Sequence, residues 1–311
     1  MNKISRYADL FSNVVRWTPL IATQRLKTQT LHRIPEPSAI MDGADSVSDF
    51  NAAASTSLFI SYACALEIIY RCAGEIEGEA IDFACGPGNF SIALLKYLKA
   101  DRVSGIDLSE SMLTYANDNA DNMSVADAVN FVQGNILDLA TLPVVPASLT
   151  TFTGTAHHME NLGEVETVLR NMEALTRDNG VIFVMDLVRL KEKRLTERYV
   201  NTVGRNLVRE GLGHFYEDFR HSMFAAWTVA ELRSAVPKDT RRTWVHLTPK
   251  GLPVLQMLIG LPKGQDVLFQ HDRPLWDESS NPVPEKIYGE WMLARSSFLK
   301  GDQFIISSNI H

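Results

Sequence analysis

The sequence predicts an α/β protein with a doubly wound, seven-stranded and mostly parallel sheet. Three observations support this fold class. An apolar, β-prone run at residues 80–84 ends abruptly in a glycine turn, and a helical pattern follows it. Short apolar strands and amphipathic helices then alternate along the chain, as they do in parallel sheets with right-handed crossovers. The last two expected strands are joined by the turn Thr248-Pro-Lys-Gly, so the final strand is expected to be antiparallel.

The elements of this core follow in order from the same patterns. Polar residues mark two helix starts: Ser109 is a candidate N-cap, and Thr228 with Glu231 forms the T-x-x-E pattern of a capping box. Ser48 or Asp49 is the candidate cap of an earlier helix. We expect strands at residues 79–84, 102–106, 128–132, 148–153, 181–185, 241–247 and 252–261, and helices at residues 90–99, 109–119, 162–172 and 228–236.

Residues 1–75 are predicted to form a helical segment outside this core. Apolar side chains recur at helical spacing within residues 4–14 and 58–69, and a loop with two prolines separates these stretches at residues 33–45. Aromatic residues of the segment could face a cation or an apolar ligand, although aromatics at helical spacing usually join a core. They are Tyr7, Trp17, Phe50 and Tyr62.

Two further segments extend the core. Residues 187–224 are expected to be a long helical insertion, and residues 262–311 a C-terminal extension broken by prolines. Within that extension, residues 304–306 could be an edge strand. The expected division is an N-terminal segment at 1–75, a core at 76–261 and the extension at 262–311.

Composition narrows the function classes. The chain has 311 residues, and its 45% hydrophobic content is ordinary for a globular protein. Its net charge of −7 argues against a nucleic-acid-binding surface, which would need a basic patch for the phosphates. No apolar run approaches membrane-spanning length, and the N-terminus lacks the apolar core of a signal peptide. Three cysteines without a CxxC pair favour a reducing cytoplasm.

The glycine turn predicts a nucleotide-binding site. Gly86 and Gly88 can adopt backbone angles forbidden to other residues and let a ligand approach the main chain. The following helix presents free N–H groups to the same crevice. Asp82 lies inside the strand, where a carboxylate is costly, and Asp107 ends the next strand roughly twenty residues past the glycines, where an acid can bind ribose hydroxyls.

At these residues the chain resembles the class I S-adenosylmethionine (SAM)-dependent methyltransferases. The resemblance covers about residues 79–190, with its blocks in the family's order and spacing. They are D-x-x-C-G-x-G-x-x-S at Asp82–Ser91, G-I-D-L-S-x-x-M-L at Gly105–Leu113, F-V-Q-G-N at Phe131–Asn135, A-H-H-M at Ala156–Met159 and D-N-G-V-I-F-V-M-D at Asp178–Asp186.

The resemblance implies the Rossmann-like fold of the class I methyltransferases, with SAM as the cofactor. It also implies that residues 1–75 form a lid over the active site, and the alternative is that they simply pack against the sheet. It puts Asp82 and Gly86 near the methionine part of SAM, Asp107 on the ribose and Leu108 against the adenine. Asn135 stands where the family commonly has Asp on the adenine amino group, and an Asn carbonyl oxygen can still accept that bond. The expected cofactor-binding residues are Asp82, Ala84, Cys85, Gly86, Gly88, Asn89, Asp107, Leu108, Met112, Asn135, Ile136 and Gly154.

His157 and His158 follow the fourth strand, at a place that borders the transferred methyl group in the resembling family. Either histidine could act as a general base toward an acceptor O–H or N–H, because its ordinary pKa is near neutral. The alternative is that one caps the next helix and the other orders a loop. Asp186 ends the fifth strand on the same edge and could face the substrate.

The insertion carries further candidates. Insertions at this place commonly build the acceptor pocket in the resembling family, which makes Tyr216 and His221 catalytic candidates. If the stretch is helical, His214, Asp218 and His221 share one face at a spacing compatible with metal binding, and His157 or His158 could complete such a site. The alternative is a hydrogen-bonding network, and we expect no metal.

The function expected from the resemblance is methyl transfer from SAM to a nitrogen or oxygen of a small molecule, in the cytoplasm. A homodimer is left open, and no nucleic-acid or membrane partner is expected. Two other functions remain open: transfer or cyclisation of the aminocarboxypropyl arm of SAM, which releases methylthioadenosine, and non-catalytic SAM binding. Intact Asp82, Gly86, Gly88 and Asp107 argue against the non-catalytic alternative.

Overall fold

The computed structural model describes residues 17–38, 41–54, 58–142, 145–265, 267–277 and 280–306, without the side chain of residue 206. The helix expected within residues 4–14, and Tyr7 with it, lies outside the described residues.

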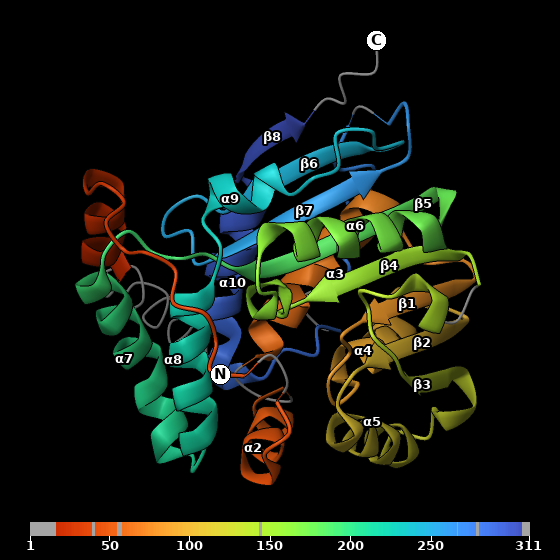
Figure 1. The fold of residues 1–311 in the computed structure, drawn as a ribbon, viewed down its shortest axis with the longest axis horizontal. Coiled ribbons are helices and arrows are strands. Elements are labelled where there is room, and N and C mark those ends of the chain that lie inside the picture. The colour runs from red at the N-terminus through yellow and green to blue at the C-terminus, as the bar shows by residue number, and fades with distance from the viewer. Residues whose placement is uncertain are drawn as a thin grey trace.

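The described strands form one eight-stranded sheet in the order β3-β2-β1-β4-β5-β7-β6-β8 (Figure 1). Strands β1 to β5 are parallel, β7 pairs antiparallel with both β5 and β6, and β8 pairs antiparallel with β6. The strands are β1 Glu79–Phe83, β2 Arg102–Asp107, β3 Val129–Gln133, β4 Ala147–Thr153, β5 Thr176–Leu187, β6 Thr243–Thr248, β7 Leu255–Leu261 and β8 Asp302–Ile306.

The doubly wound, mostly parallel α/β class is confirmed, and the count of seven strands is wrong by one. The eighth strand, β8, contains the run at residues 304–306 that was only a candidate edge strand. Its residues are mostly exposed and it pairs on one side only, so no burial pattern distinguishes it from a loop in the sequence.

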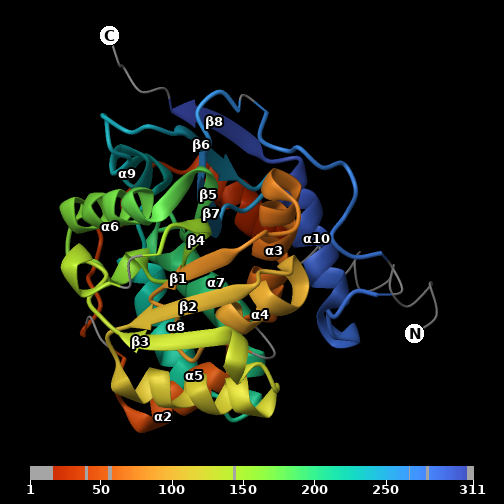
Figure 2. The same ribbon diagram turned by 90° about the vertical axis from the view of Figure 1, so that its right-hand side faces the viewer.

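The helices cover both faces of the sheet, and Figure 2 shows α3, α4 and α10 on one side and α6 and α9 on the other. Residues 17–26 are also helical. The helices are α2 Ala44–Ala54, α3 Phe59–Ala73, α4 Asn89–Leu98, α5 Glu110–Asn122, α6 Leu162–Leu175, α7 Lys193–Arg209, α8 Gly213–Ala225, α9 Val229–Ser234 and α10 Tyr288–Leu299.

Strand alternation divides the core between the two faces. In β5, Val181 and Met185 belong to the core under α3, α4 and α10, while Ile182 and Val184 belong to the core under α6 and α9. All four side chains are buried, and each such side chain contributes about 1.5–3 kcal/mol by leaving water. A strand buried on both faces reads as a continuous apolar run, as the sequence of β5 does.

The C-terminal extension packs against α3 within the same body. Trp276, Trp291 and Phe298 are buried in the core that contains α3. The buried Glu67 of α3 accepts hydrogen bonds from Arg295 at 2.8 Å and from the backbone N–H of Leu275 at 2.9 Å. The extension therefore completes one face of the sheet.

Two of the expected caps are confirmed and one is wrong. Ser109 accepts the backbone N–H of Met112 at the start of α5, and Thr228 with Glu231 forms a capping box at α9. Helix α2 begins at Ala44, so neither Ser48 nor Asp49 caps the helix over residues 58–69. The Asp49 carboxylate instead accepts backbone N–H bonds at the start of α8, a partner far away in the sequence.

The insertion at residues 187–224 forms α7 and α8, which lie side by side next to the carboxyl ends of the strands (Figure 1). No single helix among the described residues is long and apolar enough to cross a membrane. Helices α2 and α3 pass that length and composition test only as a pair bent by 55°.

Candidate functional site

Two cavities adjoin at the carboxyl ends of the parallel strands. The first, here called the glycine-loop cavity, has a volume of about 300 Å³ and lies over the ends of β1 and β2. The second, called the histidine cavity, has a volume of about 440 Å³ and lies between the end of β5 and helices α7 and α8. Both volumes are of the size that small-molecule sites occupy. The two cavities share the wall residues Met41, Phe50, Tyr62, Thr153, Gly154 and His158.

The glycine loop has the backbone geometry that its sequence predicts. Gly86 has φ +53° and Gly88 has φ +72°, in the left-handed region that favours glycine. A Cβ on Gly88 would lie 2.6 Å from Cζ of Phe131, so this glycine is required for packing as well as for its backbone angle. A Cβ on Gly86 would meet nothing closer than 3.8 Å, because Gly86 faces the cavity.

Asp107 connects this loop to helix α5. Its Oδ2 accepts the backbone N–H of Gly86 at 2.8 Å, and its Oδ1 accepts that of Ser109 at 2.9 Å. Burial raises the pKa of the Asp107 carboxyl, although these backbone bonds oppose the shift. The carboxylate lines the glycine-loop cavity and has lone pairs left for a ligand.

Most of the residues predicted to bind the cofactor line the glycine-loop cavity. Asn135 is among them, although its Oδ1 also accepts the backbone N–H of Leu137 at 3.0 Å, which is the behaviour of a turn residue. Leu108 is 45% exposed at the mouth. The predicted residues on this wall are Ala84, Cys85, Gly86, Asp107, Leu108, Met112, Asn135, Ile136 and Gly154.

Three of the predicted residues are not on the cavity wall. Asp82 lies beneath it, 1% exposed, and accepts hydrogen bonds from Ser91 at 2.7 Å and Thr151 at 2.6 Å. Burial raises the pKa of Asp82 to about 6. Gly88 packs against α5 and β3, and Asn89 donates to Asn51 of α2 at 2.9 Å. These residues support the loop from behind.

In the histidine cavity, His157 and Asp186 form a buried pair. Nδ1 of His157 lies 2.6 Å from Oδ1 of Asp186, which also accepts the backbone N–H of Leu187. Since Asp186 can only accept when ionised, Nδ1 carries the proton and Nε2 keeps its lone pair in the neutral ring. Burial alone lowers the pKa of His157, but Asp186 and then Glu36 outweigh it, and the pKa is raised.

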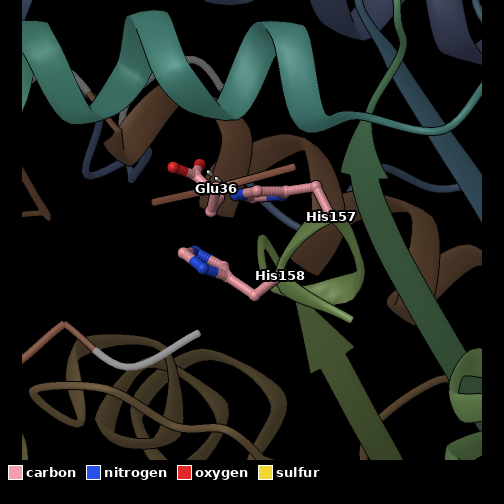
Figure 3. Close-up of side chains that lie close together, drawn as sticks. All are labelled: Glu36, His157 and His158. Atoms are coloured by element: carbon pink, nitrogen blue, oxygen red, sulfur yellow. Dashed lines mark ion pairs between the residues drawn. The ribbon is translucent and has the colours of Figure 1, made fainter. Parts of the chain in front are cut away.

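His158 and Glu36 complete a cluster around Nε2 of His157, as Figure 3 shows. Nε2 of His157 lies 3.9 Å from Oε1 of Glu36. Burial and the neighbouring His157 lower the pKa of His158 to about 3, and burial raises the pKa of Glu36. Glu36 lies between Pro35 and Pro37 in the loop before α2, where no sequence pattern marked it as functional.

Arg33 fixes the segment that carries Glu36, residues 28–38, which we call the strap. The Arg33 guanidinium lies 3.9 Å from the centroid of the Trp227 ring. It donates to four backbone carbonyls, three of them in the turn between β4 and α6, residues 154–161, which we call the histidine turn. These acceptors are the carbonyls of Ala225 at 2.7 Å, Glu160 at 3.0 Å, His157 at 2.9 Å and Met159 at 2.7 Å.

The candidates on helix α8 separate in space. Asp218 lines the histidine cavity, and burial raises its pKa. The Tyr216 hydroxyl donates to Asn201 at 2.9 Å, and Tyr216 is not on the wall of either cavity. His221 borders a small hollow on the other side of the strap, and His214 is exposed beside Asp45. Among the described residues, the cluster with metal-ligand spacing contains none of these four.

The rest of the histidine cavity is mostly apolar, with side chains from segments far apart in the sequence. Trp17, Phe50 and Tyr62, three of the aromatic residues noted in the N-terminal segment, lie on its wall. Tyr199 of α7 and Phe219 of α8 join them. An apolar wall with a few buried polar groups is typical of sites for small organic molecules.

Comparison with known proteins identifies related sequences. Residues 77–230 match a family model described as "Methyltransferase domain". A "Probable methyltransferase ltbC" of Aspergillus luteorubrus is 25% identical over 139 residues, which cover 43% of this chain and 46% of that protein. A "2-phytyl-1,4-naphtoquinone methyltransferase" of Synechococcus elongatus is 24% identical over 110 residues, which cover 35% and 46%. The chain thus spans about half the length of the curated relatives that it matches.

Solved structures show the same fold. A putative S-adenosyl-L-methionine-dependent methyltransferase of Methanococcus maripaludis superposes with a TM-score of 0.53 at 19% identity, covering 73% of this chain and 98% of that protein. The plantazolicin methyltransferase BamL, solved with a triazolic desmethylPZN analog and SAH, has a TM-score of 0.51 at 15% identity and covers 70% and 90%.

Proposed function

Since residues 77–230 form a class I S-adenosylmethionine-dependent methyltransferase domain, for which SAM is the cofactor, we propose that this chain methylates a small, largely apolar molecule at oxygen or nitrogen. The observation that carries the proposal is the meeting of the two cavities at Thr153, Gly154 and His158. One cavity lies on the glycine loop, and the other is an apolar chamber with a polar end. A methyl group can pass between them without crossing solvent.

We propose that the glycine-loop cavity binds SAM, and that Asp107 accepts the ribose hydroxyls with its remaining lone pairs. Gly86 presents open backbone to the amino-acid part, and Leu108, Asn135 and Ile136 surround the adenine. Asp82 acts from beneath: through Ser91 and Thr151 it connects the start of α4 to β4. We assign it to the support of the loop rather than to ligand contact, because it is buried below the wall.

The acceptor is proposed to occupy the histidine cavity with its nucleophilic atom toward His157 and His158. Bound SAM supplies a methyl group on a charged sulfur, so the chain mainly has to align the acceptor with that methyl and exclude water. For an acceptor that carries a proton, we assign the role of general base to Nε2 of His157. Asp186 holds that ring in the required tautomer and stabilises its charged form.

The N-terminal segment is proposed to act as a lid. Phe50 and Tyr62 lie on the walls of both cavities, Trp17 lies on the histidine cavity, and the strap is fixed across the histidine turn by Arg33. Helices α7 and α8 form the outer wall of the acceptor chamber. A cytoplasmic location is supported by the three cysteines, which are buried and unpaired. The homodimer stays a prediction.

Two measurements test the proposal. The first is calorimetric titration of the full chain with SAM and S-adenosylhomocysteine (SAH). The second is mass spectrometry of cell extract incubated with the protein and SAM. We expect micromolar binding of both ligands and a metabolite heavier by one methyl group. Methylthioadenosine as the product would move the function to aminocarboxypropyl chemistry. Binding without any modified product would indicate a non-catalytic SAM-binding protein. Absence of binding would overturn the cofactor assignment.

A further inference from the structure

Three potential ligand atoms converge beside the histidine cavity, whose wall includes His157 and His158 but not Glu36. One nitrogen from each of His157 and His158 and one carboxylate oxygen of Glu36 lie within 4.8 Å of one another. The histidines come from the turn after β4 and Glu36 comes from the strap, so the cluster joins segments more than a hundred residues apart (Figure 3). From the sequence, His157 or His158 was only a possible addition to a site at His214, Asp218 and His221, and Glu36 was not considered.

Oε1 of Glu36 is buried without a hydrogen-bond partner among the described residues, and so is Nδ1 of His158. The side chain of Glu36 is only 8% exposed and that of His157 is 5% exposed. The 3.9 Å between Glu36 and Nε2 of His157 is too long for a hydrogen bond, so this contact leaves the carboxylate oxygen unsatisfied. Leaving such groups unpaired in a protein interior is unfavourable.

The surroundings orient these atoms in the way that metal sites require. Asp186 binds Nδ1 of His157, which fixes the ring with the Nε2 lone pair toward Glu36. A carboxylate behind a ligating histidine is the usual arrangement around zinc. His158 hydrogen-bonds to the backbone of Ser38, which leaves Nδ1 as its unpaired nitrogen. Arg33 brings positive charge nearby, and the carboxylates of Glu36 and Asp186 oppose it.

We propose that Glu36, His157 and His158 bind a divalent transition-metal ion of the zinc type, with an open position toward the histidine cavity. Two imidazoles and one carboxylate are a ligand set found in catalytic zinc sites, where water or substrate takes the remaining position. The nitrogen ligands favour such an ion over magnesium or calcium, which prefer oxygen. A single cation would satisfy all three converging atoms.

This inference rests on the proposed function and narrows it to oxygen acceptors. An acceptor hydroxyl at the open position would bind the ion as its O–H bond breaks, and its proton would pass to solvent water. The resulting oxyanion then forms the new O–CH₃ bond as the S–CH₃ bond of SAM breaks, and SAH leaves. The acceptor class is therefore a phenol, an enol or another acidic hydroxyl compound. In this form of the enzyme His157 is a ligand rather than a free base.

The test uses the full chain without a histidine tag, stripped with a chelator and then dialysed against Zn²⁺ alone. We expect one zinc ion per chain by elemental analysis, and visible absorption bands of a tetrahedral site when Co²⁺ replaces Zn²⁺. Glu36→Gln and His158→Ala should each weaken Zn²⁺ binding at least tenfold, and Asp186→Asn by roughly 10- to 100-fold. Asp218→Asn is the matched control: it removes a half-buried carboxylate from the wall of the histidine cavity and should bind Zn²⁺ as the unmodified chain does.

SAH affinity and thermal unfolding of each variant show whether it is folded, and they separate the two proposals. Zn²⁺ binding that is absent, or equal in all variants, overturns the metal site. Methyl transfer that persists in the presence of a chelator also overturns the metal site. It leaves the proposed function intact, with His157 as the general base. If the unmodified chain does not bind SAH, the proposed function itself is refuted.

Discussion

Asp107→Asn tests the cofactor site at its best-defined contact. The carboxylate accepts one backbone N–H on each oxygen, from Gly86 at 2.8 Å and from Ser109 at 2.9 Å. Asparagine has almost the same shape but offers only one oxygen. Its NH₂ group must therefore face one of the two N–H donors, and either the glycine loop or the start of α5 loses its connection.

The size of the effect follows from these two bonds. Hydrogen bonds to a charged group contribute about 1.5–3 kcal/mol each, and the substitution removes at least one together with the charge that would accept ribose hydroxyls. Because about 1.4 kcal/mol corresponds to a tenfold change in an equilibrium constant, SAH affinity should fall by about 10- to 150-fold. Global unfolding should remain cooperative, since the core beneath the loop is untouched.

Titration calorimetry with SAH measures this change, and Asp101→Asn is the matched control. Asp101 precedes the same strand, β2, at its other end, where its exposed carboxylate accepts one backbone N–H, that of Gly78 at 3.0 Å. Its loss should leave SAH affinity within about twofold of the unmodified chain, because it lies on neither cavity. If Asp107→Asn binds SAH within threefold of the unmodified chain, Asp107 does not contact the ligand as proposed.

Three further predictions concern stability, each measured by denaturant unfolding. Gly88→Ala should lower the free energy of unfolding by about 2–5 kcal/mol, because a Cβ there meets the ring of Phe131 at 2.6 Å in a left-handed backbone. Gly154→Ala should lower it by only about 1–2 kcal/mol, because Gly154 has φ +67° but open space around it. Equal losses in the two variants would contradict this reasoning. Arg33→Ala should lower the free energy of unfolding by roughly 2–4 kcal/mol and make the strap susceptible to proteases, since four hydrogen bonds to carbonyls and a ring contact are lost. An unchanged rate of proteolysis would refute this role of Arg33. Folding raises the pKa of Asp82 from 3.8 to about 6, so the folded protein binds a proton at this carboxyl more tightly than the unfolded chain does. Protonation of Asp82 therefore stabilises the fold below pH 4, and this contribution is lost as the pH rises through 6. Between pH 4 and 7 the free energy of unfolding of the unmodified chain should fall by up to about 3 kcal/mol more than that of Asp82→Asn. If the free energies of unfolding of the two proteins change in parallel with pH, the effect is excluded.

Local patterns predicted the strand–turn–helix unit at the glycine loop well. The apolar run of β1, the two glycines and the amphipathic α4 are each determined by residues close together in the chain, and the structure places them within a residue or two of the expected bounds. The caps at Ser109 and Thr228 were predictable for the same reason, because a cap bonds to a backbone group three residues away.

Contacts between distant segments could not be predicted in this way. Asp49 looked like a cap for its own neighbourhood and instead binds the first turn of α8. Glu36, in a loop between two prolines, carries no local signal, yet Arg33 and the strap bring it beside the histidines. The i, i+4, i+7 spacing of His214, Asp218 and His221 suggested a metal-binding face, but packing turns these side chains toward different surroundings.

The sequence by itself determined the α/β class, the succession of core strands and helices along the chain, the glycine loop and the place of Asp107 at the end of β2. Each of these depends on periodicity and on neighbours along the chain. Only the tertiary structure decided that Asp82 supports the loop from below, that His157 pairs with Asp186, and that Glu36 joins the two histidines. Those relations depend on which strand ends and loops meet in space. The order of strands in the sheet and the packing of distant segments determine these contacts, and the periodicity of the sequence does not encode them.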